Sequence, residues 1–184
     1  MKAETETCPD CRVVLPKFDG PVHRYLGASP SCWAMYSALS GGGEPPIAPG
    51  PLNALLVDAY ATQHPGTLTH FSAPSNQAIQ SVAVHLLTLY GVLERGVSIE
   101  RAIWLRTRGL RDGSRHKHER FTWLTPPSFA DSLKIADIVA APTPSARTAR
   151  LADYVQDVWS IWWKTDHAVT IVQWYERYIV PEKI

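Results

Sequence analysis

A chain of 184 residues is long enough for one domain with a substantial core and too short for two full-sized ones. Its hydrophobic share of 45%, charged share of 19% and formal net charge of +1 are ordinary for a soluble globular protein, and they predict no strong attraction to nucleic acid or to an anionic membrane. The N-terminal residues MKAETETC have no apolar run of the signal-peptide kind, and no stretch approaches the ~18 apolar residues of a membrane span. We therefore expect one cytoplasmic domain over residues 1–184, with no nucleic-acid or membrane partner.

All three cysteines lie near the N-terminus, as a Cys8-x2-Cys11 pair followed by His23 and Cys32. In a reducing cytoplasm, clustered cysteines hold metal more often than they form disulfides, and three is an odd number for a disulfide framework. A Cys-x2-Cys turn gives two thiolates to one metal, and a second pair from elsewhere completes the tetrahedron that zinc prefers. The sequence therefore predicts a zinc site formed by Cys8, Cys11, His23 and Cys32.

Other ligand sets and other roles stay open for this site. His64 is the leading substitute for His23, and Asp10 is a weaker one. Arg12 stands where many zinc knuckles have glycine after the second cysteine, which departs from the standard turn. A thioredoxin-like redox pair would need a βαβ setting that this region lacks. A closed site of four protein ligands, which we favour, stabilises the fold, whereas an open three-cysteine site would activate water beside His23.

The rest of the chain shows mainly helical patterns. A short strand at residues 12–16 belongs to the knuckle, and later apolar residues recur at helical spacing between capping residues and Pro or Gly stops. The predicted helices cover residues 30–39, 52–63, 76–95, 99–108, 135–140 and 148–178, the last with a break near 164–166. Loops are predicted at 40–50, which is rich in Gly and Pro, and within the basic stretch 106–120. The fold class is therefore all-α, a bundle of five to seven helices (33–184) packed against a small zinc-knuckle-like lobe (1–32).

Asp58, His64, His85 and His167 form a second group of candidate functional residues, on or at the ends of three predicted helices. Histidines from facing helices can build an acid/base site or a second metal site. We hypothesise that they meet in one pocket, where a histidine acts as general base or metal ligand toward a small molecule. In the structural alternative, His64 bonds to carbonyls at its own helix end, His85 bonds to Asp58, and His167 packs among tryptophans.

Several stretches carry a resemblance to a known family. They read CPDC, DGPVHRYLGASPSCW, VDAYATQHPG, IQSVAVHLLTLYGVLERG and FTWLTPP. From Cys8 to about Trp174 the chain resembles an uncharacterised bacterial family of small soluble proteins, a domain of unknown function. The resemblance implies that the following residues belong to family motifs: Cys8, Cys11, His23, Cys32, His64, His85 and His167. It implies no activity.

The sequence as a whole favours a zinc-binding helical protein with a histidine-lined pocket. We lean toward a metal-dependent enzyme that carries out hydrolysis or group transfer on a small molecule. The alternative is a non-catalytic interaction module, whose zinc lobe presents Arg24 and Tyr25 to a protein partner.

Overall fold

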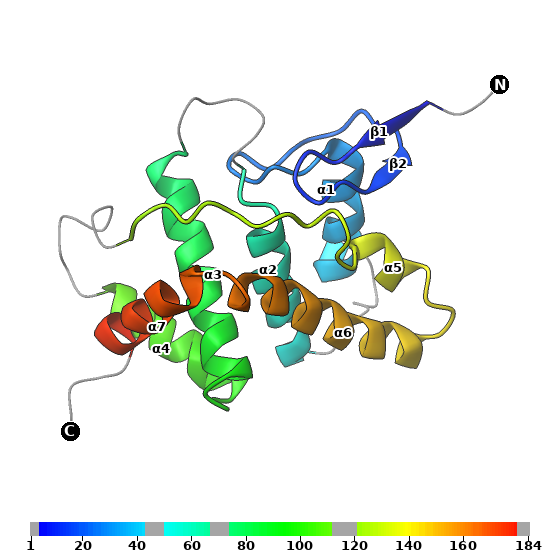
Figure 1. Ribbon diagram of the computed structural model, residues 1–184. Helices are drawn as coiled ribbons and strands as arrows, with labels where there is room; N and C mark the ends of the chain where they lie inside the picture. Colours follow the sequence, from blue (N-terminus) through cyan, green and yellow to red (C-terminus); the bar gives the residue numbers. More distant parts are fainter. Residues whose placement is uncertain (1–3, 43–49, 67–73, 112–120, 180–184) are drawn as a thin grey trace.

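The computed structural model describes residues 4–42, 50–66, 74–111 and 121–179, in which seven α-helices accompany one two-stranded sheet (Figure 1). In chain order the elements are β1 (Thr5–Thr7), β2 (Val14–Pro16), α1 (Pro30–Ser37), the π-helical turn η1 (Ala38–Gly42), α2 (Gly50–Gln63), α3 (Asn76–Leu93), α4 (Ile99–Arg111), α5 (Ile135–Val139), α6 (Pro144–Trp163) and α7 (His167–Tyr178). The predicted all-α class with a small N-terminal lobe is confirmed. None of the helices in these segments has the length and apolar character needed to cross a membrane.

Helix α2 lies at the centre of the bundle and packs against both α3 and α6 (Figure 1). Leu56 and Tyr60 on α2 are almost fully buried, as are Trp159 and Trp162 on α6. The indole N–H of Trp162 donates to the carbonyl of Thr62 at 3.1 Å, so α6 fixes the last turn of α2. The C-terminal end of α2 is therefore fixed by packing and by a hydrogen bond to α6.

The start of α1 follows directly from its sequence. The Ser29 hydroxyl accepts a hydrogen bond from the N–H of Cys32 at 3.3 Å, and Pro30 occupies the first turn, where its missing N–H costs nothing. The helix thus begins at residue 30, as predicted, and Cys32 lies in its first turn.

The N-terminal hairpin is fastened to the same helix end. Strands β1 and β2 pair antiparallel with Glu6 opposite Leu15, and Leu15 is buried. A carboxylate oxygen of Glu6 accepts from the N–H of Ser31 at 2.8 Å, and the Ser31 hydroxyl donates to the carbonyl of Pro16 at 2.6 Å. A negative charge at a helix N-terminus is also favoured by the helix dipole. The hairpin and α1 therefore form one unit.

Two helix boundaries differ from the predictions by three residues or more. Helix α6 begins at Pro144, four residues before the predicted start at residue 148, because Thr143 caps it and Pro144 is tolerated in the first turn. Helix α4 continues to Arg111, beyond the predicted end at residue 108. The predicted break near 164–166 is confirmed, since α6 ends at Trp163 and α7 begins at His167. Parts of the two predicted loops, 43–49 and 112–120, lie outside the described residues.

Candidate metal centre

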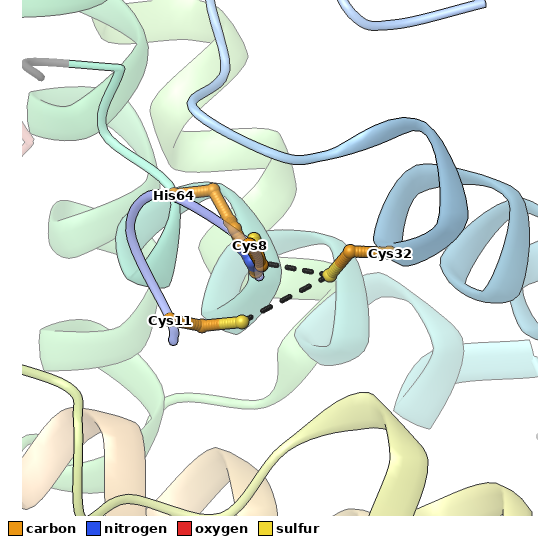
Figure 2. Close-up of side chains that lie close together, drawn as sticks. All are labelled: Cys8, Cys11, Cys32 and His64. Carbon is orange, nitrogen blue, oxygen red and sulfur yellow. Dashed lines mark hydrogen bonds between the residues drawn. The ribbon is translucent and has the colours of Figure 1, made fainter. Parts of the chain in front are cut away.

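Three sulfurs and one imidazole converge at the junction between the N-terminal lobe and α2 (Figure 2). The ligand atoms of Cys8, Cys11, Cys32 and His64, which we call the Cys3His cluster, all lie within 4.8 Å of one another. The Sγ atoms of Cys11 and Cys32 are 3.9 Å apart, and Nε2 of His64 is 3.4 Å from Sγ of Cys32. A tetrahedral zinc with ordinary bond lengths would hold sulfur–sulfur pairs about 3.8 Å apart and sulfur–nitrogen pairs about 3.6 Å apart. The cluster therefore has the dimensions of a zinc site.

The turn that carries Cys8 and Cys11 is closed by backbone hydrogen bonds. The N–H of Cys8 donates to the carbonyl of Val13 at 2.8 Å, and the N–H of Arg12 donates to the carbonyl of Cys8 at 3.1 Å. Arg12 has a φ of 65°, the left-handed conformation that glycine adopts most easily. Arg12 thus takes the conformation that suits glycine, and the turn still forms.

His64 enters the cluster from the C-terminal end of α2. Its Nδ1–H donates to the carbonyl of Tyr60 at 2.9 Å, which leaves Nε2 to face the sulfurs. A backbone carbonyl that fixes the tautomer in this way is typical of metal-binding histidines. The Tyr60 hydroxyl donates to Sγ of Cys32 at 3.5 Å, so this one tyrosine supports two of the four candidate ligands. Tyr60 was not identified from the sequence as a residue that supports the site. Its position four residues before His64 places the two residues one helical turn apart, and this spacing could have indicated the contact.

The pKa values of three groups in the cluster are shifted by their mutual contacts. Hydrogen bonds from Cys11 and Cys32 hold the pKa of Cys8 well below its usual range. Interaction with Cys11 and Cys8, together with burial, raises the pKa of Cys32 well above its usual range. Burial lowers the pKa of His64, but hydrogen bonds with Cys11 and Cys8 outweigh it and raise that pKa to about 10. The thiols of Cys8 and Cys32 and the imidazole of His64 therefore interact strongly, and a divalent cation among them would favour the thiolate form that binds metal.

Hydrogen bonds also connect the chain segments that surround the cluster. The N–H of Gly27 donates to the carbonyl of His64 at 3.3 Å, and the N–H of Asp10 donates to the carbonyl of Gly27 at 3.3 Å. A carboxylate oxygen of Asp10 accepts from the N–H of Gly66 at 2.8 Å, and burial raises the pKa of Asp10 to about 6. Asp10, the weaker substitute ligand, therefore serves to hold the loop after α2 rather than to complete the cluster.

The predicted fourth ligand, His23, lies outside the cluster, and His64 takes its place. The ring of His23 packs against Tyr25, with centroids 4.4 Å apart, and against Trp33, with centroids 4.9 Å apart. Cys32 and Trp33 are successive residues of a helix and therefore point about 100° apart, so a ring that packs on Trp33 is directed away from the Cys32 sulfur. The predicted quartet is corrected to Cys8, Cys11, Cys32 and His64.

The other predicted site residues do not join His64 in one pocket. Nδ1 of His85 lies 2.6 Å from a carboxylate oxygen of Asp58, and His85 lines a cavity of about 150 Å³ that neither His64 nor His167 lines. Nε2 of His167 bonds to the carbonyl of Thr125 at 2.8 Å, and its ring packs near Trp162. Each histidine thus makes the contact expected in the structural alternative, and the catalytic roles stay predictions. Among the residues that the structure describes, only the Cys3His cluster groups three or more candidate metal ligands.

The comparisons with known proteins give a family and no activity. The model of a family of unknown function, DUF5946, matches residues 6–163 and so includes the whole Cys3His cluster. No curated protein and no solved structure matches the chain.

Proposed function

The chain belongs to DUF5946, a family of unknown function, and we propose from its geometry that it is a zinc protein with one closed structural site. The observation that carries the proposal is the burial of the whole Cys3His cluster. The four residues are between 0% and 1% exposed, and their ligand atoms lie within 4.8 Å of one another. Structural zinc sites have four protein ligands, whereas catalytic sites keep a position for water or substrate.

The donor set favours zinc over the other common metals. Thiolates are soft ligands, and three of them with one imidazole in a tetrahedron form a set typical of structural zinc. Calcium and magnesium prefer oxygen ligands, which this cluster does not offer. Three unpaired buried cysteines also suit the reducing cytoplasm, where we place the protein.

The role of the zinc is to join three parts of the chain. Cys8 and Cys11 come from the knuckle turn, Cys32 from the first turn of α1, and His64 from the end of α2 (Figure 2). Because such a site does not exist in the unfolded chain, the free energy of metal binding adds to the free energy of folding. Zinc would therefore hold the hairpin and α1 against the central helix of the bundle.

A closed site changes where chemistry can take place. With four protein ligands and no exposed edge, the zinc cannot bind and activate water, so the predicted metal-dependent hydrolysis or transfer has no support at this centre. An acid/base role is left for His85, which the carboxylate of Asp58 orients at 2.6 Å. In this proposal the metal stabilises the fold, and any reaction takes place elsewhere.

Metal analysis of two matched histidine variants tests the proposal. We expect one zinc per wild-type chain by elemental analysis, less than about a tenth of that in His64→Gln, and a full equivalent in His23→Gln. Second-shell changes alone cost roughly 10- to 100-fold in metal affinity, so loss of a ligand should exceed that range. Wild-type protein without bound metal, or His64→Gln with undiminished metal content, would refute the proposed site.

A further inference from the structure

A second site lies beside the metal centre, in a cavity of about 150 Å³ between residues 23–26 and the helices α1, α2 and α3. The residues that matter for its chemistry are His23, Trp33, Tyr36, Tyr60, Ser81 and His85. Ser81 and His85 are four residues apart on α3 and so share one face of that helix. The cavity therefore has polar groups on one helix and aromatic groups on the others.

His85 has the arrangement of an oriented acid/base group. Its Nδ1–H donates to the carboxylate of Asp58 at 2.6 Å, which makes Nε2 the nitrogen available to a ligand. The Asp58 side chain is 2% exposed and that of His85 is 18% exposed, so a buried carboxylate holds an imidazole that solvent and ligands can still reach. A carboxylate in this position fixes the ring and favours a hydrogen bond accepted at Nε2.

His23 contributes a wall to the same cavity. Its ring packs against Trp33 with centroids 4.9 Å apart, and its Nδ1 is buried away from the open space. The residue that fails as a zinc ligand thus shapes the cavity, and the hydrogen bond to a ligand falls to His85.

The size and the walls of the cavity limit what it can hold. Engineered protein cavities of about 150 Å³ accept one benzene-sized ring. Four of the lining side chains are the aromatic residues Tyr25, Trp33, Tyr36 and Tyr60, which favour a flat aromatic partner. A larger hollow of about 410 Å³ shares His23, Tyr25 and Leu26 with this cavity, but His85 does not line it.

We propose that this cavity binds a single-ring aromatic compound that carries one O–H or N–H group, such as a phenol or an azole, and that the group donates its hydrogen bond to Nε2 of His85. The site goes beyond the structural zinc centre, because none of its lining residues is one of the four proposed zinc ligands. His85 would be the ligand-contacting residue, and Asp58 would be a positioning residue.

Phenol and toluene, which have nearly the same shape, test the proposal on the zinc-loaded full chain. We expect saturable phenol binding by protein-observed NMR, with the largest shift changes on the His85 ring. Phenol should bind about tenfold more tightly than toluene, as one hydrogen bond to an oriented imidazole predicts. His85→Leu should reduce phenol affinity to that of toluene, whereas His167→Gln, which changes a histidine outside the cavity, should leave both affinities unchanged.

Zinc content and circular dichroism of each variant separate a lost ligand contact from a lost fold. If His85→Leu does not fold, Ser81→Leu provides a second test, because a larger side chain on the same face should fill the cavity and abolish binding of both probes. Equal affinity for phenol and toluene, an unchanged phenol affinity in His85→Leu, or no saturable binding of either probe would overturn the proposal.

Discussion

The Cys3His cluster and the His85 cavity both centre on a histidine next to α2, but they differ in how completely the protein satisfies that histidine. In the cluster, Nδ1 of His64 bonds to the carbonyl of Tyr60, and Nε2 faces three sulfurs in a site without exposed surface. In the cavity, Nδ1 of His85 bonds to Asp58, and Nε2 is the nitrogen left for a ligand. The difference is the basis of our two proposals, that the first site holds the fold together and that the second receives another molecule.

Removal of the metal should have the largest effect, and it should act on both sites. We expect a strong chelator to abolish the cooperative thermal transition, because structural zinc contributes about 10 kcal/mol or more in small zinc-binding units. Amide exchange should rise first in residues 5–33, which the cluster joins to α2, and phenol binding should be lost with them. A chelated protein with an unchanged thermal transition would show that the fold does not need the metal.

Gly66→Ala should be strongly destabilising although Gly66 is not a candidate metal ligand. Gly66 has a φ of 81°, and a Cβ there would lie 2.5 Å from the carbonyl oxygen of Tyr25. The clash and the left-handed conformation together should cost about 3 kcal/mol in a denaturant titration.

Gly96→Ala is the matched control for this substitution. Gly96 also has a positive φ, 64°, but a Cβ there would meet nothing within 4 Å. Only the conformational cost of about 1 kcal/mol should remain. Equal losses of stability in the two variants would show that residues 25–27 do not crowd Gly66.

Asp58→Asn should affect the His85 cavity and leave the Cys3His cluster unchanged. The buried carboxylate would become an amide that accepts a weaker hydrogen bond from His85, which should cost about 2 kcal/mol of stability. Zinc content should not change, because Asp58 is not part of the Cys3His cluster. As a control, Glu4→Gln removes an exposed ion pair with Lys17 and should cost less than about 1 kcal/mol. Loss of zinc in Asp58→Asn would show that the cavity and the centre depend on each other directly.

Local signals made much of the fold predictable. Ser29 and Pro30 mark the start of α1, and the predicted interval near 164–166 separates α6 from α7, because capping and proline effects act over a few neighbouring residues. The start of α6 was misplaced for a related reason. The predicted helix begins at residue 148, after Pro144, although proline in the first turn is compatible with a helix.

The site was predictable only where its ligands are close in the sequence. Cys8 and Cys11 are three residues apart, and their spacing alone indicates a metal turn. His64 joins them only because α2 ends at the knuckle, and this tertiary arrangement has no local signature. His23 was preferred because it is nearer in the chain, but its ring packs on Trp33 instead. Distance along the sequence was therefore a poor guide to the fourth ligand.

Arg12→Gly should have the smallest effect, and it tests why the knuckle tolerates an unusual residue. Arg12 has a φ of 65° and an exposed side chain. Glycine would remove a left-handed strain of about 1–2 kcal/mol but would add about 0.4–1 kcal/mol of chain entropy to the unfolded state. The net expectation is a gain of about 0.5 kcal/mol, measured by denaturant titration of zinc-loaded protein. Arg12→Val should instead lose stability, since a β-branched residue fits this conformation worst, and both variants should keep a full equivalent of zinc. A loss of stability in Arg12→Gly relative to the wild-type protein would show that contacts of the Arg12 side chain outweigh the strain of its left-handed backbone.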